Sequence, residues 1–147
     1  MPHFTRQFTN GAPLIIATLG VTPGRAQALT AANLPIPTLQ RMTGLIDTGA
    51  SCTCVDPAIV QALSLAQTGS IMAFTPSTGS EGALMPQYDA SLRIYASATQ
   101  SPLEIPTIPI AATPLRYMGI DALIGRDILA HCILVHNGDS GTFSLAF

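Results

Sequence analysis

The chain has 147 residues, of which 48% are hydrophobic and 10% charged, and its formal net charge is −2 at pH 7. This composition excludes intrinsic disorder, which requires few apolar residues and many charges. All six basic residues are arginines, which excludes lysine Schiff-base chemistry and the Gly-Lys phosphate-binding loop. The slightly acidic balance argues against nucleic acid or an anionic membrane as a partner. A chain of this length is expected to form a single domain over residues 1–147.

The first part of the chain predicts a strand, a helix and a second strand. Pro13–Val21 is rich in β-branched and apolar residues, which is typical of a strand. Thr22, followed by a proline, resembles a helix N-cap and predicts a short helix over Gly24–Asn33. Arg41–Ile46 is extended again, and it runs directly into Asp47.

The middle of the chain predicts a helix and a hairpin. Asp56 is a suitable N-cap for a helix with Pro57 in its first turn. Two apolar stretches, Ile71–Phe74 and Ala83–Tyr88, flank a polar segment that contains glycine. This pattern predicts a β-hairpin with a long tip.

The last third of the chain predicts further strands and one short helix. The predicted strands are Ser91–Tyr95, Ile105–Ile110 (an edge strand, because it contains prolines), Ala122–Ile124, and a hairpin of Ile133–His136 with Thr142–Phe147. Arg126–His131 is predicted to form one or two helical turns. The sum is a mostly-β domain with two or three short helices.

The cysteines, together with the lack of an apparent membrane or signal segment, indicate the cellular compartment of the protein. No stretch reaches the roughly 18 consecutive apolar residues of a membrane helix, and the N-terminus lacks the order of a secretory signal. Cys52 and Cys54 lie too close for an easy mutual disulfide, and Cys132 is the third thiol. Reduced thiols in a cytoplasmic protein are therefore expected. Two readings of these residues stay open: small buried apolar side chains, or a metal site formed by Cys52, Cys54 and a histidine.

The first candidate site follows the strand that ends at residue 46. Residues 45–51 read Leu-Ile-Asp-Thr-Gly-Ala-Ser. An aspartate at the end of a buried strand is partly desolvated, so its charge needs donors nearby. Thr48, the Gly49 amide and Ser51 are at a suitable distance in the sequence from Asp47. Asp-Thr-Gly is also an ordinary turn after a strand, and this alternative stays open.

A second motif completes a family pattern. Residues 122–129 read Ala-Leu-Ile-Gly-Arg-Asp-Ile-Leu. Together with Asp-Thr-Gly-Ala and the hairpin between them, they resemble the retroviral-type aspartic proteases (retropepsins), which have these three features in this order. The resemblance covers about Leu14 to Phe147 and implies a retropepsin-like acid-protease β-barrel with a flap hairpin. Residues 24–37 fall where the family has a shorter turn, so they are interpreted as an insertion. The high alanine content favours a bacterial member.

The resemblance implies an aspartic endopeptidase that works as a homodimer. Two carboxylates share one proton across a bound water; one activates the water and the other donates to the substrate carbonyl. Asp-Thr-Gly occurs once in the chain, so each subunit would contribute one Asp47 at a two-fold axis. Thr48 would join the two motif loops across that axis, and Gly49 completes the catalytic motif. The substrate would be a peptide or protein, and no cofactor or metal ion is implied.

The same resemblance implies which residues bind substrate. Ala50 and Ser51 follow the catalytic motif, and Ser77, Thr78 and Gly79 would form the flap tip over an extended peptide. Many viral members carry an acidic residue in place of Ser51. A plain surface loop is the alternative for the tip.

Other candidate residues receive different interpretations. Arg126 and Asp127 are interpreted as structural, with a buried arginine bonding backbone carbonyls at the start of a helix. His131 and His136 suggest a histidine-based hydrolase with Ser51 or Cys52, but no Gly-X-Ser-X-Gly elbow accompanies them.

Two further hypotheses remain beside an active homodimer. The chain is a catalytically idle peptide-binding or dimerisation module that keeps the fold, or it is a protease domain cut from a longer polyprotein.

Overall fold

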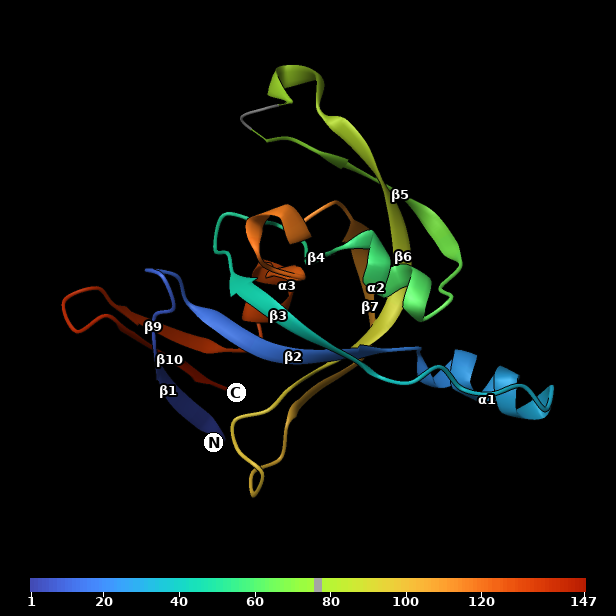
Figure 1. Cartoon of the computed structure of the whole chain (residues 1–147), viewed down its shortest axis with the longest axis horizontal. Coiled ribbons are helices and arrows are strands. Elements are labelled where there is room, and N and C mark those ends of the chain that lie inside the picture. The colour runs from blue at the N-terminus through green and yellow to red at the C-terminus, as the bar shows by residue number, and fades with distance from the viewer. Residues whose placement is uncertain (76–77) are drawn as a thin grey trace.

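The computed structural model of the protein describes residues 1–75 and 78–147 and is mostly β, as predicted (Figure 1). The strands are β1 (His3–Gln7), β2 (Leu14–Gly20), β3 (Gln40–Ile46), β4 (Cys54–Val55), β5 (Gln67–Ala73), β6 (Ala83–Ile94), β7 (Leu103–Ala112), β8 (Ala122–Ile124), β9 (Ile133–Asn137) and β10 (Thr142–Ala146). The helices are α1 (Pro23–Ala31), α2 (Pro57–Ala62) and α3 (Arg126–Leu129), with 3₁₀ turns η1 (Gly79–Glu81) and η2 (Arg116–Met118).

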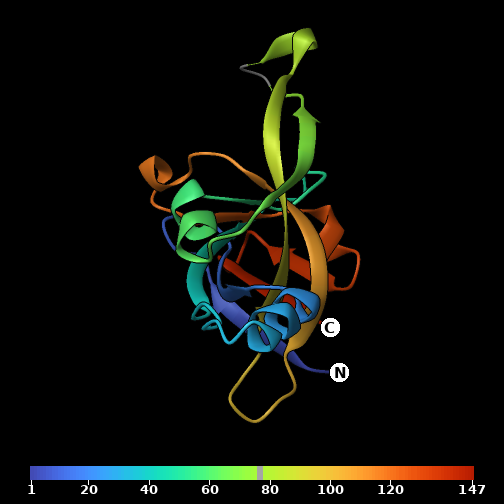
Figure 2. The ribbon, with the colours of Figure 1, turned by 90° about the vertical axis from the view of Figure 1, so that its right-hand side faces the viewer.

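Six of the strands close into a barrel. They follow the order β2-β3-β8-β4-β7-β6, and β2 also pairs with β6, which closes the ring. β5 pairs with β6 outside this ring, so the β5–β6 hairpin rises above the barrel (Figure 2). The predicted barrel with a projecting hairpin is confirmed.

A separate three-stranded sheet brings the two termini together. Its order is β1-β10-β9, with both pairs antiparallel. The Phe147 amide donates to the Pro2 carbonyl at 3.0 Å, and both ends of the chain lie at this sheet in Figure 1. Of these strands, β1 was not anticipated from the sequence, because its five residues are mostly polar.

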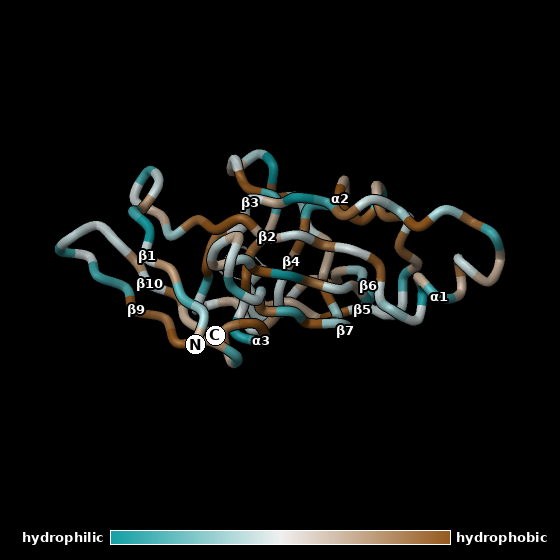
Figure 3. Tube along the Cα trace, turned by 90° about the horizontal axis from the view of Figure 1, so that it is seen from below, coloured by the Kyte–Doolittle hydropathy of each residue, from teal (hydrophilic) through white to brown (hydrophobic). Residues whose placement is uncertain are grey.

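One hydrophobic core serves both sheets. Alternate residues of β2 (Ile15, Ala17 and Leu19) are buried inside the barrel, as expected for a strand with one face in the core. Phe143 and Leu145 of β10 belong to the same buried cluster. Figure 3 shows apolar segments along the barrel strands, whereas the β9–β10 turn is hydrophilic. Phe143 and Leu145 each contribute roughly 1.5–3 kcal/mol to stability on full burial, so their packing anchors the small sheet to the barrel.

The N-caps identified in the sequence are present. Thr22 Oγ1 accepts a hydrogen bond from the Arg25 amide at 3.2 Å, and α1 begins at Pro23. Leu29 is the buried residue of α1, which projects sideways from the barrel in Figure 1. Asp56 caps α2 in the same way.

One strand prediction is wrong and a second holds only in part. Ala83–Tyr88 and Ser91–Tyr95 were expected as separate strands, but they form the single 12-residue strand β6, because Asp89 and Ala90 continue the ladder to β7. The edge prediction for Ile105–Ile110 holds for that proline-containing stretch, which pairs with β6. Beyond it, residues 111–112 also pair with β4.

Asp56 does more than cap a helix. It is 7% exposed, and its Oδ1 accepts the Ala58 amide at 3.0 Å. Its Oδ2 accepts the amides of Leu115 and Arg116 at 2.9 and 3.1 Å. The hydrogen bond from the Leu115 backbone is the main reason why the pKa of Asp56 is lowered from its usual value. The ionised carboxylate therefore ties α2 to the loop before β8.

Replacing Asp56 with asparagine is expected to lower the free energy of unfolding by about 1–3 kcal/mol at pH 7. Because the folded pKa lies below the unfolded one, the ionised group stabilises the fold above pH ~4 and loses this effect as the pH falls through the folded pKa. The difference in the free energy of unfolding between parent and variant should therefore shrink toward pH 3. Urea unfolding at pH 7 and pH 3 measures this, with the exposed Asp139→Asn as control. If the two proteins are equally stable at pH 7, or if the difference in their free energies of unfolding does not change with pH, the ionised Asp56 carboxylate does not stabilise the fold in this way.

Candidate active site

The chain places Asp47 at the point where β3 leaves the sheet. β3 runs parallel to β8, with Ile46 opposite Ile124. The Asp47 amide donates to the Ile124 carbonyl at 3.0 Å, which fixes the end of the strand. The side chain of Asp47 is half-buried at this edge.

The Asp47 carboxylate is held by the turn that follows it. Its Oδ1 accepts the Gly49 amide at 2.9 Å and the Ala50 amide at 3.2 Å. In the described part of the chain, Oδ2 accepts no hydrogen bond. The predicted Gly49 donor is confirmed, but Ala50 replaces the predicted Thr48 and Ser51, because the tight turn directs successive amides at the carboxylate. A Cβ on Gly49 would lie 3.1 Å from Oδ1, so glycine allows this close approach.

Arg126 fixes the other side of the same turn. Its Nη1 donates to the carbonyls of Thr48 and Gly49 at 3.0 and 3.3 Å, and its amide donates to the Ala50 carbonyl at 2.9 Å. The expectation that Arg126 bonds backbone carbonyls is confirmed. The expectation that it is buried is wrong for this chain, because the guanidinium reaches across the outside of the turn and is exposed.

A second contact, which the sequence does not predict, joins Thr53, two residues beyond the first motif, to Asp127 of the second motif. Thr53, which is fully buried, donates through Oγ1 to Asp127 Oδ1 at 2.7 Å and through its amide to Oδ2 at 2.8 Å. The Gly125 amide in turn donates to Thr53 Oγ1 at 3.1 Å. Nothing in the sequence around Thr53 indicates this role, since its partner lies 74 residues away.

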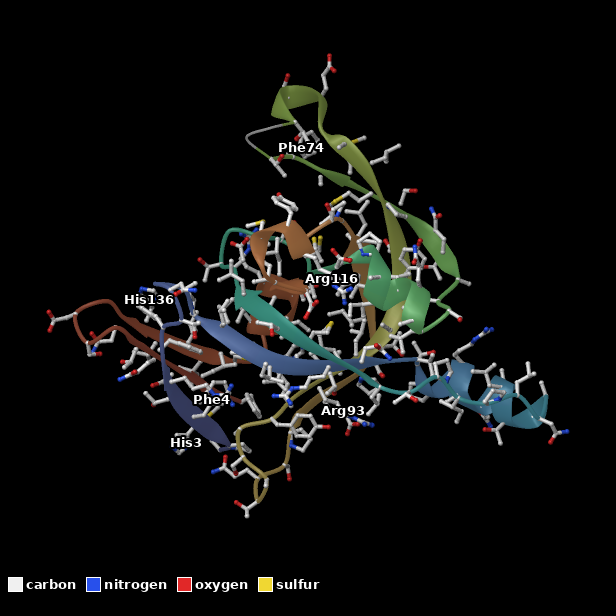
Figure 4. All side chains as sticks on the ribbon, in the orientation of Figure 1. His3, Phe4, Phe74, Arg93, Arg116 and His136 are labelled. Carbon is white, nitrogen blue, oxygen red and sulfur yellow. The ribbon has the colours of Figure 1, made fainter. Side chains whose placement is uncertain are left out.

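A cavity of about 480 Å³ opens beside Asp47. The segment after β3 forms its floor, the β5–β6 hairpin forms its roof, and Leu123 and Arg126 form its side. Figure 2 shows the hairpin above the barrel, and Figure 4 labels Phe74 on this hairpin. The lining residues are Asp47, Gly49, Ala50, Ser51, Cys52, Cys54, Ile71, Met72, Ala73, Phe74, Thr75, Met85, Leu123 and Arg126. The structure thus brings four of the predicted site residues together: Asp47, Gly49, Ala50 and Ser51.

Thr48 faces a different part of the surface. Its side chain is exposed and lines a second hollow of about 380 Å³, together with Arg126 and Leu129. Thr48 therefore lies beside the cavity that contains Asp47, not within it.

The tip of the hairpin is a hydrogen-bonded turn. Thr78 Oγ1 accepts from the Thr75 amide at 2.8 Å, and the Gly79 amide donates to the Thr75 carbonyl at 3.1 Å. Gly79 has φ +60°, a conformation that favours glycine. Within residues 78–147, neither Thr78 nor Gly79 lines the cavity, and Ser77 lies outside the described residues.

The histidines lie away from the cavity. His136, on strand β9 of the three-stranded sheet (Figure 4), packs against Phe8 with the ring centroids 4.6 Å apart and the ring planes tilted by 33°. His131 is exposed at the end of α3. The structure therefore gives no support to a histidine-based hydrolase at this site.

In residues 1–75 and 78–147, no group of three or more His, Cys, Asp or Glu side chains is placed to hold a metal ion. Across the same residues, no helix is long and apolar enough to cross a membrane.

Comparison with known proteins identifies the fold. No protein-family model and no curated protein matches the sequence. Among solved structures, a retropepsin-like aspartic protease from Rickettsia conorii matches 97% of this chain and 89% of its own, with a TM-score of 0.57 and 15% identity. A likeness at this identity concerns the architecture. The chain therefore has the retropepsin-like fold of aspartic proteases, as its two sequence motifs predicted.

Proposed function

We propose that the protein is an aspartic endopeptidase that hydrolyses peptide bonds as a homodimer. One observation carries this proposal: Asp47 has one carboxylate oxygen held by two amides and lines a large cavity under a hairpin, on a retropepsin-like fold. Oδ2 of Asp47 would activate a water, and the partner subunit's Asp47 would hold the shared proton and donate it to the substrate carbonyl.

The second carboxylate is assigned to another copy of the chain because, among the described residues, no second carboxylate lines the cavity that contains Asp47. Asp127 is bound to Thr53, and Asp121 accepts the Thr43 amide at 3.0 Å and pairs with Arg116 at 3.1 Å. A two-fold axis beside Asp47 would supply the missing group.

Thr48 suits a position at that axis. It is exposed beside Asp47, and Arg126 fixes its carbonyl at 3.0 Å. We assign Thr48 to hydrogen bonds between the two motif loops. Gly49, whose amide holds Oδ1, completes the catalytic motif.

The hairpin is assigned to substrate binding. Ala50 and Ser51 line the cavity floor, where an extended peptide would lie. Thr78 and Gly79, with Ser77, would close over this peptide as a flap.

The cavity walls are largely apolar, and the mechanism uses no cofactor or metal ion. The cytoplasm, inferred from the three thiols, is the proposed compartment.

The test is incubation with an unbiased peptide mixture between pH 4 and pH 9, with mass spectrometry of the products. Cleavage should be fastest at acidic pH and fall as the pH rises, because two carboxylates in contact must hold one proton. A chelator should not change the rate. Binding of peptides without any cleavage would favour the idle module, and a flat pH profile would contradict the carboxylate mechanism.

A further inference from the structure

The segment after α1, residues 32–39, projects from the barrel beside that helix and exposes apolar side chains (Figure 1). It is neither helix nor strand from residue 34 to residue 39. Pro35 and Pro37 lack the amide proton that pairing in a sheet requires, and they hold the residues before them extended. Leu34, Ile36 and Leu39 are 55, 51 and 45% exposed. Three large apolar side chains, close together on a projecting segment, indicate a binding surface.

A row of polar side chains crosses the barrel at the root of this segment. Thr18 on β2 is paired with Arg41 on β3 and with Arg93 on β6. Directly opposed residues share one face of a sheet, so the three side chains are neighbours. The residues on either side of Thr18 are buried inside the barrel, which places this row on the outer face.

Leu39 connects the apolar segment to this row. A Cβ placed on Gly20 would lie 2.5 Å from Leu39 Cδ2, so the leucine side chain covers that glycine. Gly20 is two residues beyond Thr18 on β2 and therefore lies on the same face. The exposed apolar side chains and the arginine row thus belong to one continuous surface.

Part of the row lacks partners. In residues 1–75 and 78–147, Thr18 Oγ1 is buried and has no hydrogen-bond partner, which calls for an explanation. Arg41 is exposed and forms no ion pair with the described residues, whereas Arg93 pairs with Glu104 through Nε. Because Arg41 is not tied, it can move aside and let an anionic oxygen reach the hydroxyl. An anion between the two arginines would satisfy both Arg41 and Thr18.

The net charge of the whole chain conceals where its cations lie. A value of −2 argues against an anionic membrane only when it is averaged over all residues. The first acidic residue is Asp47, and Arg6, Arg25 and Arg41 precede it. Arg25 and Arg41 flank the uncharged stretch 26–40, which contains the exposed apolar side chains. Anionic phospholipids offer phosphate oxygens and acyl chains together. A second copy would instead bring like charges face to face.

We propose that the outer face of β2, β3 and β6, together with residues 32–39, attaches the protein to an anionic phospholipid bilayer. The exposed apolar side chains of residues 32–39 enter the boundary between headgroups and acyl chains. A lipid phosphate lies between Arg41 and Arg93 and accepts a hydrogen bond from the Thr18 hydroxyl. The attachment does not depend on the proposed peptidase activity.

The first experiment measures sedimentation of the full chain with vesicles. Vesicles of phosphatidylcholine alone are compared with vesicles that contain about 30% phosphatidylglycerol, at low and high salt. We expect binding to the anionic vesicles at least about tenfold tighter at low salt, and loss of this difference at high salt. Equal binding to both kinds of vesicle, or binding to neither, would overturn the proposal.

Matched variants test the arginine row. Arg41→Gln should weaken binding to the anionic vesicles about fivefold, whereas Arg6→Gln, an equal charge change on β1, should bind as the parent does. Thr18→Val removes the hydroxyl and keeps the shape. It should weaken binding at least about threefold without lowering stability in urea, because a buried hydroxyl without a partner does not stabilise the fold. Equal effects of the two arginine variants, or parent-like binding by Thr18→Val, would contradict the assigned phosphate position.

A fluorescence experiment tests the apolar segment. The chain contains no tryptophan, so a single introduced one reports its own surroundings. The emission of Ile36→Trp should shift to shorter wavelength with anionic vesicles, and that of Val135→Trp, at a similarly exposed position on β9, should not. A shift in both proteins or in neither would overturn the proposal. A shift of Ile36→Trp that grows with protein concentration in the absence of vesicles would show that a second copy covers the segment, and would also overturn it.

Discussion

Replacing Asp47 with asparagine is expected to reduce kcat/KM for peptide cleavage by at least about 10³-fold while leaving the fold intact. The amide oxygen of asparagine accepts the Gly49 and Ala50 amides as Oδ1 does now, so the turn should keep its geometry. The ionisable group is lost, and with it both the activation of water and the shared proton. Steady-state kinetics measure the loss, and thermal unfolding checks the fold.

The matched control is Asp139→Asn, at an exposed aspartate in the β9–β10 turn. It changes the net charge equally and should keep the parent rate. An Asp47→Asn protein that cleaves within a few-fold of the parent would show that Asp47 is not catalytic.

Replacing Gly125 with alanine is expected to damage both stability and activity. Gly125 has φ −85°, which alanine adopts freely, so the effect is purely steric. The added Cβ would lie 2.6 Å from the Cys52 backbone, which must move. Overpacking of this kind costs about 1–3 kcal/mol, and displacing the Asp47 turn by about 1 Å could lower the rate roughly 10²-fold.

Urea unfolding and peptide kinetics measure the two effects together. Gly138→Ala is the control, because a Cβ there meets nothing within 4 Å. Equal stability and rate for Gly125→Ala and the parent would mean that the contact between the two motifs does not position the catalytic turn.

The local elements and the first motif could be predicted because their signals are local. The N-caps Thr22 and Asp56, each followed by a proline, mark where α1 and α2 begin, and the Leu-Ile-Asp-Thr-Gly run marks the end of β3. Of the two amides that donate to Asp47, the sequence predicts that of Gly49 but not that of Ala50. The direction of an amide depends on the turn geometry and not on the residue type.

Contacts between distant segments could not be predicted in this way. β4 is two residues long, and it exists because Cys54 and Val55 fit between β7 and β8. The Thr53–Asp127 contact likewise depends on the packing of two loops. The exposure of Arg126 follows from the path of its side chain across the turn. The interpretation of residues 24–37 as an insertion stays a prediction.

The central claim is that the active site contains one Asp47 from each of two chains. Its most direct test is the activity of mixed dimers. Parent and Asp47→Asn proteins are mixed in varying ratios under conditions where subunit exchange is confirmed independently by mass spectrometry of differently tagged chains. A mixed dimer would contain one catalytic carboxylate and should be nearly inactive, so activity should fall as the square of the parent fraction, to about a quarter of the all-parent activity at equal amounts. A linear fall, leaving about half of the activity at equal amounts, would show that each chain works alone and would contradict the symmetric mechanism.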